Sequence, residues 1–154
     1  MVRVMFVCLG NICRSPMAEF VFRDMVKKAG LEDQFRIASA ATSTWELGNP
    51  PHYGTQAELK KHGISCSGKR AVRLKKSDYQ DYDLLLGMDH ENIYDMNRLF
   101  GGDPENKIHL LKEYSVGGEV DDPWYSGDFK TTYEDVSLAC ENLLEKLKKD
   151  LRVN

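Results

Sequence analysis

The 154-residue sequence lacks the features that would place it in a membrane, on a secretory route or on nucleic acid. No apolar stretch approaches the roughly 18 residues that a membrane span requires. The apolar run at residues 2–9 contains Arg3 and meets a polar segment too early for a signal peptide. The net charge of −3 gives no general affinity for nucleic acid. We therefore expect a cytoplasmic protein that has neither a membrane nor a nucleic acid as its partner.

Cysteine pairs with the spacing of a zinc site are also missing. The four cysteines are Cys8, Cys13, Cys66 and Cys140, and no two of them are separated by two residues. His62 and Cys66 could supply half of a zinc site, but no second spaced pair completes it. The chain is long enough to bury a hydrophobic core without the support of disulfides, so we expect reduced thiols. We also expect neither a metal nor another cofactor.

Acidic residues are absent from one long segment and dominate another. Residues 60–76 contain seven Lys or Arg and no Asp or Glu, whereas residues 113–135 contain seven acidic residues and one basic residue, Lys130. Two solvated faces are the commoner explanation of such runs. The alternative is that the basic stretch lies near an anion site and attracts a substrate.

Strand-like and helix-like segments alternate along the chain. Short apolar runs at residues 2–7, 35–41, 82–88 and 108–111 are typical of buried strands. Helices are predicted from Pro16 to about residue 30, at 53–62, after Asp89 to about residue 99, and along an apolar stripe at 133–151, with a loop at 116–129. This order predicts a single domain over residues 1–154, with a three-layer α/β fold in which helices flank a four-stranded parallel sheet.

The polar segment between the first strand and the first helix is a candidate phosphate-binding loop. It reads Cys8-Leu9-Gly10-Asn11-Ile12-Cys13-Arg14-Ser15. Backbone N–H groups that converge at a helix N-terminus favour an anion of phosphate size, and ligands of such sheets bind at this edge. Gly10 and Asn11 both tolerate left-handed backbone. Arg14 offers a planar fork that matches two phosphate oxygens.

Cys8 is a candidate nucleophile in this loop. Comparable settings lower the pKa of a thiol from about 8.5 into a range of roughly 3.5–7.5, so Cys8 should be a thiolate at neutral pH. Ser15 could donate a hydrogen bond that stabilises this thiolate as a leaving group. An inert buried thiol is the alternative, and the combination with Arg14, a Gly-Asn pair and a strand–helix junction weighs against it.

The Cys-x5-Arg-Ser loop resembles that of the low-molecular-weight protein tyrosine phosphatases. Residues 7–19 are similar to the family signature nearly residue for residue, and the resemblance covers essentially the whole chain. Further blocks that resemble family motifs, in their usual order, are residues 39–43, 48–51, 88–89 and 122–125. The resemblance implies hydrolysis of phosphotyrosine through a cysteinyl-phosphate intermediate. It also implies that Cys8 is the nucleophile, Arg14 the phosphate clamp and Asp122 the general acid.

Asp122 can also be considered without the family. Cleavage of a monoester must protonate the leaving oxygen, and a carboxylic acid on a loop that faces the site can do so. Pro123 stiffens the backbone after Asp122, but chemistry alone leaves Asp121 as a rival. A turn-forming Asp-Pro pair is the other explanation.

The resemblance extends to the substrate pocket and to redox chemistry. Trp45, Trp124 and Tyr125 lie in predicted loops that the family places around its pocket, so they are expected to wall a phenyl ring and to favour phosphotyrosine over phosphoserine. Packing under loops is the alternative for these aromatic residues. Cys13 is either a packing residue or a thiol that traps oxidised Cys8 as a disulfide. The implied partners are tyrosine-phosphorylated proteins, and a monomer is expected.

Three other functions remain open at this point, and the sequence differs from the family pattern in one segment. A thiol-dependent arsenate reductase would need two further cysteines close together in sequence, whereas Cys66 and Cys140 lie far apart. A phosphoarginine phosphatase of the same family carries Thr in place of Ile12. A non-catalytic phosphate-binding module would need neither a nucleophile nor an acid. Finally, residues 68–73 lack the His that braces the loop in many family members, and the sequence leaves open whether Arg70 or another group replaces it.

Overall fold

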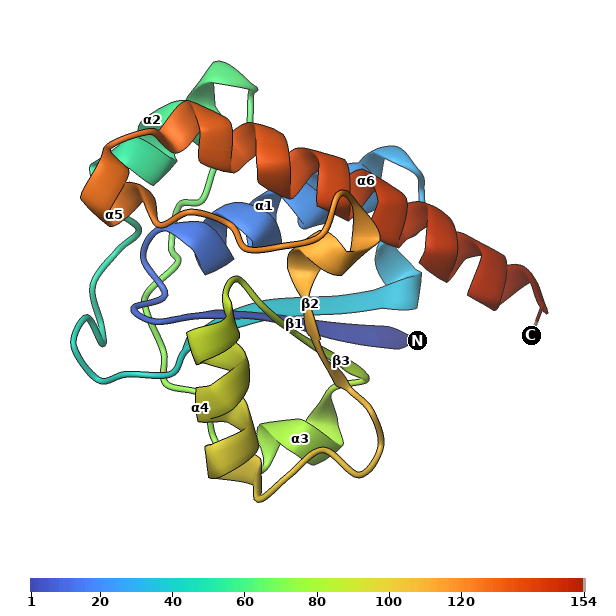
Figure 1. Cartoon of the computed structure of the whole chain (residues 1–154). Helices are drawn as coiled ribbons and strands as arrows, with labels where there is room; N and C mark the ends of the chain where they lie inside the picture. The colour runs from blue at the N-terminus through green and yellow to red at the C-terminus, as the bar shows by residue number, and fades with distance from the viewer. Residues whose placement is uncertain (154) are drawn as a thin grey trace.

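β1 (Val2–Cys8) lies inside a four-stranded parallel sheet of order β2-β1-β3-β4 (Figure 1). The other strands are β2 (Phe35–Ala41), β3 (Leu84–Gly87) and β4 (Ile108–Leu110). Val4 of β1 pairs with Ile37 on one side and with Leu84 on the other. This computed structural model describes the backbone of residues 1–153 and the side chains of residues 1–151. The predicted α/β class and parallel sheet are confirmed.

Successive residues of β1 contribute to two different cores, because side chains alternate between the faces of a strand. Val4, Phe6 and Cys8 belong to the larger core, and Met5 and Val7 belong to the smaller one. Helices α1 (Arg14–Lys28), α2 (Tyr53–Lys61) and α6 (Phe129–Val153) cover the larger core. Helices α3 (Asp78–Asp81) and α4 (His90–Phe100) cover the smaller core, on the opposite face of the sheet (Figure 1). Burial on both faces explains why β1 is almost continuously apolar.

Several element boundaries differ from the predicted ones for local reasons. Helix α1 begins at Arg14, two residues before the predicted Pro16, so the helix N-terminus starts inside the candidate loop. Leu111 leaves the predicted fourth strand for a 3-10 turn (Leu111–Tyr114), and another 3-10 turn spans Glu32–Gln34. Asp89 caps α4 as predicted, in a capping box with Asn92.

The predicted loop at residues 116–129 is wrong in part, because it contains the one-turn helix α5 (Pro123–Ser126). Asp122 caps this helix through a hydrogen bond from the Trp124 N–H, and Pro123 occupies the first helical position. Gly127 ends the turn with φ +73°. These start and stop residues were visible in the sequence, but a helix of one turn has no apolar stripe to reveal it.

The basic segment of residues 60–76 is mostly a solvated face. Six of its seven Lys and Arg side chains are exposed, and none of the seven lines the cavity described below. The seventh, Lys69, is largely buried. Among the helices of residues 1–153, none has the length and apolar character needed to cross a bilayer.

Candidate active site

A cavity of about 120 Å³ opens at the edge of the sheet where β1 ends and α1 begins. Three segments line it: the loop after β1, residues 45–46 after β2, and residues 122–125 around α5. The predicted site residues that line it are Cys8, Leu9, Gly10, Ile12, Cys13, Arg14, Trp45, Asp122, Trp124 and Tyr125. Asn11 and Ser15, also predicted for the phosphate loop, lie fully buried beneath it. Glu46, which the sequence reasoning missed, lines the cavity beside Trp45.

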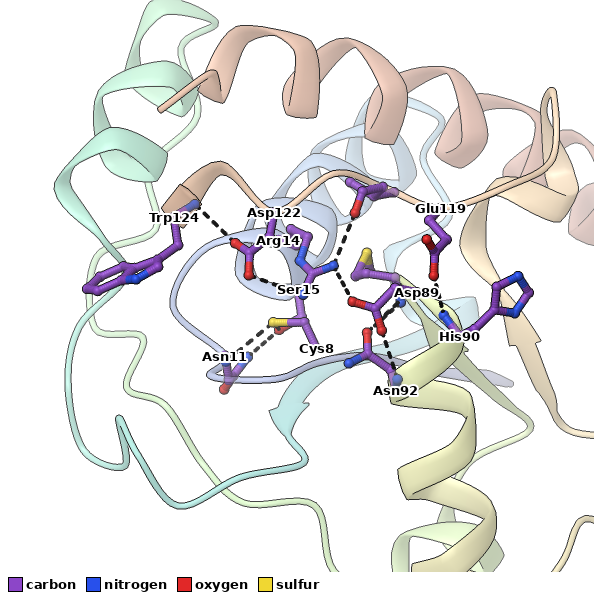
Figure 2. Close-up of polar contacts among 12 residues, drawn as sticks. Cys8, Asn11, Arg14, Ser15, Asp89, His90, Asn92, Glu119, Asp122 and Trp124 are labelled. Carbon is purple, nitrogen blue, oxygen red and sulfur yellow. Dashed lines mark hydrogen bonds and ion pairs between the residues drawn. The ribbon is translucent and has the colours of Figure 1, made fainter. Parts of the chain in front are cut away.

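The sulfur of Cys8 has two polar neighbours from its own loop (Figure 2). The Asn11 N–H donates to Cys8 Sγ over 3.3 Å, and Ser15 Oγ lies 3.0 Å from the same sulfur. Ser15 Oγ accepts a hydrogen bond from Asn11 Nδ2 at 2.8 Å, so its own hydrogen is free to point at the sulfur. Cys8 Sγ is therefore held by two groups of the loop that follows it.

Asn11 is the organising residue of the loop. It has φ +58°, a left-handed conformation that Asn adopts more readily than most residues. Its amide oxygen accepts from the Val72 N–H at 3.1 Å, which fixes the orientation of the amide. Gly10, by contrast, does not use left-handed backbone, contrary to expectation. A Cβ at Gly10 would lie 3.4 Å from Glu46 Cγ, at ordinary van der Waals distance.

The side chain of Arg14 is only 3% exposed, and three groups around it hold its guanidinium in place. Its Nη1 donates to Asp89 Oδ2 at 2.7 Å and to the Val120 carbonyl at 3.1 Å, while Nη2 lies 3.5 Å from Asp122 Oδ2 (Figure 2). Burial lowers the pKa of Arg14, but the negative charges around it outweigh burial and raise that pKa above its ordinary value. Those charges are on Cys8, Asp89 and Asp122. The guanidinium is therefore a fixed, permanent cation at the cavity.

Sequence reasoning treated Asp89 as a helix cap within a block that resembles a family motif, and it missed the contact of Asp89 with Arg14. A signal was present, because Asp89 follows β3 closely just as the candidate loop follows β1. The carboxyl ends of neighbouring parallel strands meet at one edge of the sheet. Asp89 thus serves two helices at once, as the cap of α4 and as the partner of Arg14.

The two adjacent carboxylates, Asp121 and Asp122, lie in different surroundings. Asp122 lines the cavity with a side chain that is 22% exposed, and it faces Arg14. Asp121 is exposed and is not among the residues that line the cavity. The preceding Val120 is anchored at both of its polar backbone groups, since its N–H donates to the Met88 carbonyl at 2.8 Å and its carbonyl accepts from Arg14. This anchor sets which of the two carboxylates turns inward.

The three predicted pocket aromatics form an exposed rim around the cavity. Trp45 is 73% exposed, Trp124 is 55% exposed and Tyr125 is 79% exposed. Such exposure rules out the alternative of packing under loops. The sequence reasoning missed His52, whose ring lies edge-on to Trp124 at 5.6 Å and whose backbone N–H donates to the Ile12 carbonyl at 2.8 Å.

All four cysteines are buried free thiols. Cys13 lines the cavity, and burial, together with the negative charges of Cys8 and Asp122, raises its pKa to about 12. Cys66 and Cys140 lie in the larger core, where burial raises the pKa of both. Cys13 is therefore the cysteine that shares the cavity with Cys8.

Comparisons with known proteins agree on one family. A family model described as low molecular weight phosphotyrosine protein phosphatase matches residues 3–153. The chain is 42% identical to the low molecular weight protein-tyrosine-phosphatase YfkJ of Bacillus subtilis over 97% of this chain and 98% of that protein. It is 46% identical to the low molecular weight phosphotyrosine protein phosphatase of Gallus gallus over 93% of this chain and 94% of the relative.

Solved structures support the same relationship. The crystal structure of YfkJ superimposes with a TM-score of 0.93 and covers 97% of this chain and 96% of its own. A second neighbour, the Drosophila arginine phosphatase DARP, has a TM-score of 0.86 at 30% identity and covers 94% of this chain and 97% of its own.

Proposed function

This chain belongs to the low molecular weight phosphotyrosine protein phosphatase family, and we propose that it hydrolyses phosphotyrosine in proteins, and small aryl phosphates, through a cysteinyl-phosphate intermediate. The observation that carries the proposal is that Cys8, Arg14 and Asp122, from two distant segments, line one cavity. The proposed catalytic unit is a single domain over residues 1–154.

In the first step, the Cys8 thiolate attacks phosphorus and forms an S–P bond while the bond from phosphorus to the phenol oxygen breaks. Arg14 and the N–H groups of the loop bind the phosphoryl oxygens and stabilise the charge that gathers on them. Asp122, as the carboxylic acid, transfers its proton to the departing phenol oxygen. Its carboxylate lines the same cavity as Cys8 and lies beside Arg14, which supports this role (Figure 2).

In the second step, water attacks the cysteinyl phosphate. The Asp122 carboxylate left by the first step takes a proton from that water, so the enzyme returns to its starting protonation state. The S–P bond breaks, inorganic phosphate leaves, and Cys8 is again a thiolate. The hydroxyl of Ser15, 3.0 Å from the sulfur, stabilises this leaving thiolate by donating a hydrogen bond.

Substrate selectivity follows from the cavity wall. Trp45, Trp124 and Tyr125 line the cavity with exposed aromatic surface. We expect this surface to contact the phenyl ring of phosphotyrosine, and we expect the shorter phosphoserine not to reach Cys8. Ile12, which is 8% exposed, gives the loop an apolar side chain beside the leaving group. We therefore place phosphotyrosine ahead of phosphoarginine, whose leaving group is charged.

The test compares three peptides of one sequence that carry phosphotyrosine, phosphoserine or phosphoarginine at the same position. The expected result is a kcat/KM that is highest for phosphotyrosine by at least about tenfold, the discrimination that one apolar pocket contact typically supplies. Equal values for phosphotyrosine and phosphoserine would contradict the deep aromatic pocket. A higher value for phosphoarginine would assign the chain the activity that names DARP.

The proposal also covers the cellular location, the oligomeric state and the redox chemistry of the enzyme. A cytoplasmic location suits a reaction that requires Cys8 as a reduced thiol. A monomer suffices, because every proposed site residue comes from one chain, and sedimentation at assay concentration checks this. Cys13 is proposed as the thiol that traps oxidised Cys8 in a disulfide, supported by its place in the same cavity.

A further inference from the structure

His52 contacts both sides of the candidate active site, although it does not line the cavity itself. On one side, its backbone N–H donates to the Ile12 carbonyl in the phosphate loop at 2.8 Å. On the other side, its ring lies edge-on to that of Trp124 with centroids 5.6 Å apart, and it stacks on Phe129 with centroids 5.0 Å apart. Both separations fall in the range of about 4.5–7 Å at which aromatic rings attract each other. His52 therefore connects the segment of the nucleophile to the segment of the candidate acid.

The orientation of the His52 ring is fixed by the helix that it precedes. As the N-cap of α2, His52 accepts a hydrogen bond at Nδ1 from the Gly54 N–H at 3.0 Å. Gly54 in turn admits the ring of Phe129, because a Cβ at this position would lie only 2.4 Å from that ring. The rings of His52 and Phe129 are therefore packed together at the start of α2.

The acid segment depends on contacts of this kind, because α5 is a helix of one turn and so short a helix is not stable by itself. Trp124 of α5 contacts the His52 ring, and its backbone N–H donates to Asp122 Oδ1 at 3.0 Å (Figure 2). Phe129 begins α6 directly after this segment. A ring that holds Trp124 and Phe129 in place therefore also constrains the carboxylate of Asp122.

We propose that His52 is a positioning residue whose ring, through Trp124 and Phe129, holds Asp122 where it can protonate the leaving oxygen. This inference rests on the function proposed above. The hydrogen bond from the His52 backbone to Ile12 is kept when only the side chain is changed, so the phosphate loop should retain its shape. Loss of the ring should therefore slow the reaction of substrates with a basic leaving group and spare those with an acidic one.

The experiment separates the ring of His52 from its capping role by two substitutions. His52→Asn keeps a capping acceptor and removes the ring, whereas His52→Phe keeps an aromatic ring and removes the acceptor. His52→Asn should lower kcat/KM for a phosphotyrosine peptide by about 10- to 100-fold, since a displacement of about 1 Å can cost about 10²-fold. An aryl phosphate with a strongly acidic phenol should hardly be affected. The slope of log kcat/KM against leaving-group pKa should thus become steeper in His52→Asn and stay unchanged in His52→Phe.

His62→Asn is the matched control, because His62 lies at the other end of α2 and also stacks on an aromatic residue of α6. The ring centroids of His62 and Tyr133 are 3.7 Å apart, and neither residue lines the cavity. This variant should keep the slope of the unmodified enzyme. Thermal unfolding of each variant sets a common temperature at which all are folded.

Gly54→Ala is an independent variant that leaves His52 in place. The added methyl group must displace the ring of Phe129, so this substitution should also steepen the slope. If His52→Asn does not fold, Gly54→Ala decides in its place: a steeper slope supports the positioning role, and an unchanged slope overturns it.

A second readout follows Trp124 itself and requires no substrate. The sequence contains two tryptophans, so Trp124 is the only one left in a Trp45→Phe background. Quenching of its fluorescence by acrylamide reports how firmly its ring is held. His52→Asn should raise the quenching constant in this background, and His52→Phe should restore the lower value.

Two results would overturn the positioning role. One is a His52→Asn variant with an unchanged slope. The other is an equal steepening in His52→Asn and His52→Phe, which would assign the effect to something other than the ring. The proposed function is judged separately, because an unmodified enzyme that fails to hydrolyse aryl phosphates contradicts that function, while the quenching comparison still decides whether His52 holds Trp124.

Discussion

The two sides of the candidate active site differ sharply in burial. In the phosphate loop, Asn11 and Ser15 are fully buried, and Cys8 is 2% exposed. In the segment that carries the candidate acid, Trp124 is 55% exposed and Tyr125 is 79% exposed. The buried side would contact the phosphoryl group, which is the same in every substrate. The exposed side would contact the leaving group and the protein around it, which vary.

The anchoring of the two sides differs in the same way. The phosphate loop is fixed by side-chain hydrogen bonds among Asn11, Ser15 and Ser39 and by the Val72 N–H. The acid segment is fixed by backbone contacts of Val120 and by the cap that Asp122 provides for its own short helix. Loss of Cys8 or Arg14 from the buried loop should therefore abolish the chemistry for every substrate, whereas the effect of changes in the exposed segment should depend on the leaving group.

Cys8→Ser is the largest expected effect on the buried side. A serine hydroxyl is un-ionised at neutral pH, so turnover should fall by at least about 10³-fold for every substrate, as for the loss of other catalytic nucleophiles. Binding of inorganic phosphate, measured by calorimetry, should persist because Arg14 and the loop backbone remain. A variant that keeps more than a few per cent of activity would refute the covalent cysteine mechanism.

Asp122→Asn tests the exposed side. The phenol of tyrosine has a pKa of about 10 and needs a proton to leave, so hydrolysis of phosphotyrosine should slow by about 10²–10⁴-fold. An aryl phosphate with a strongly acidic phenol should be affected much less. The measurement is the slope of log kcat/KM against leaving-group pKa, which should become steep. Asp121→Asn is the matched control and should leave that slope unchanged, whereas the reverse pattern would assign the acid to Asp121.

Cys13→Ser is the smallest expected effect, because it should change kcat/KM by no more than a few fold. After brief peroxide treatment, the unmodified enzyme should recover with dithiothreitol and show Cys8 linked to Cys13 in peptide maps, whereas the variant should lose activity irreversibly. The pKa of Cys13 is raised to about 12, so it is a thiol at neutral pH. Disulfide formation needs its thiolate and should therefore accelerate from about pH 7 to about pH 9.

A Cys66→Ser variant provides the control for the redox prediction, because Cys66 is buried in the larger core and does not line the cavity. It should recover activity as the unmodified enzyme does. A disulfide between Cys8 and Cys66, or a rate of closure that does not change with pH, would contradict the assignment of Cys13.

The backbone of the site could be predicted from the sequence more completely than its contacts. The bounds of β2 and the cap at Asp89 follow from local patterns of apolar and capping residues, and the structure has them as predicted. The contact of Asp89 with Arg14 and the inward turn of Lys69 join segments far apart in the chain. Local pattern carries no information on which of seven basic side chains is buried. That depends on the assembled fold, in which Lys69 Nζ lies 3.4 Å from the buried carboxylate of Glu19.

The choice between Asp121 and Asp122 shows the same limit. Both are acidic, adjacent and close to Pro123, so neither composition nor spacing separates them. In the structure, the hydrogen bonds of Val120 to Met88 and Arg14 determine the orientation of the two following residues. Only a resemblance across whole motifs favoured Asp122 before these contacts were known.

The central claim is that the buried loop forms a covalent bond to phosphorus while the exposed segment handles the proton. It is tested most directly by acid-quenching the Asp122→Asn variant during turnover of para-nitrophenyl phosphate. The first step then needs no acid, whereas the second lacks its base. Mass spectrometry should therefore find one phosphoryl group on the peptide that contains Cys8, on most of the protein. Continued turnover with no phosphorylated Cys8 peptide, or with the phosphoryl group on another residue, would contradict the account.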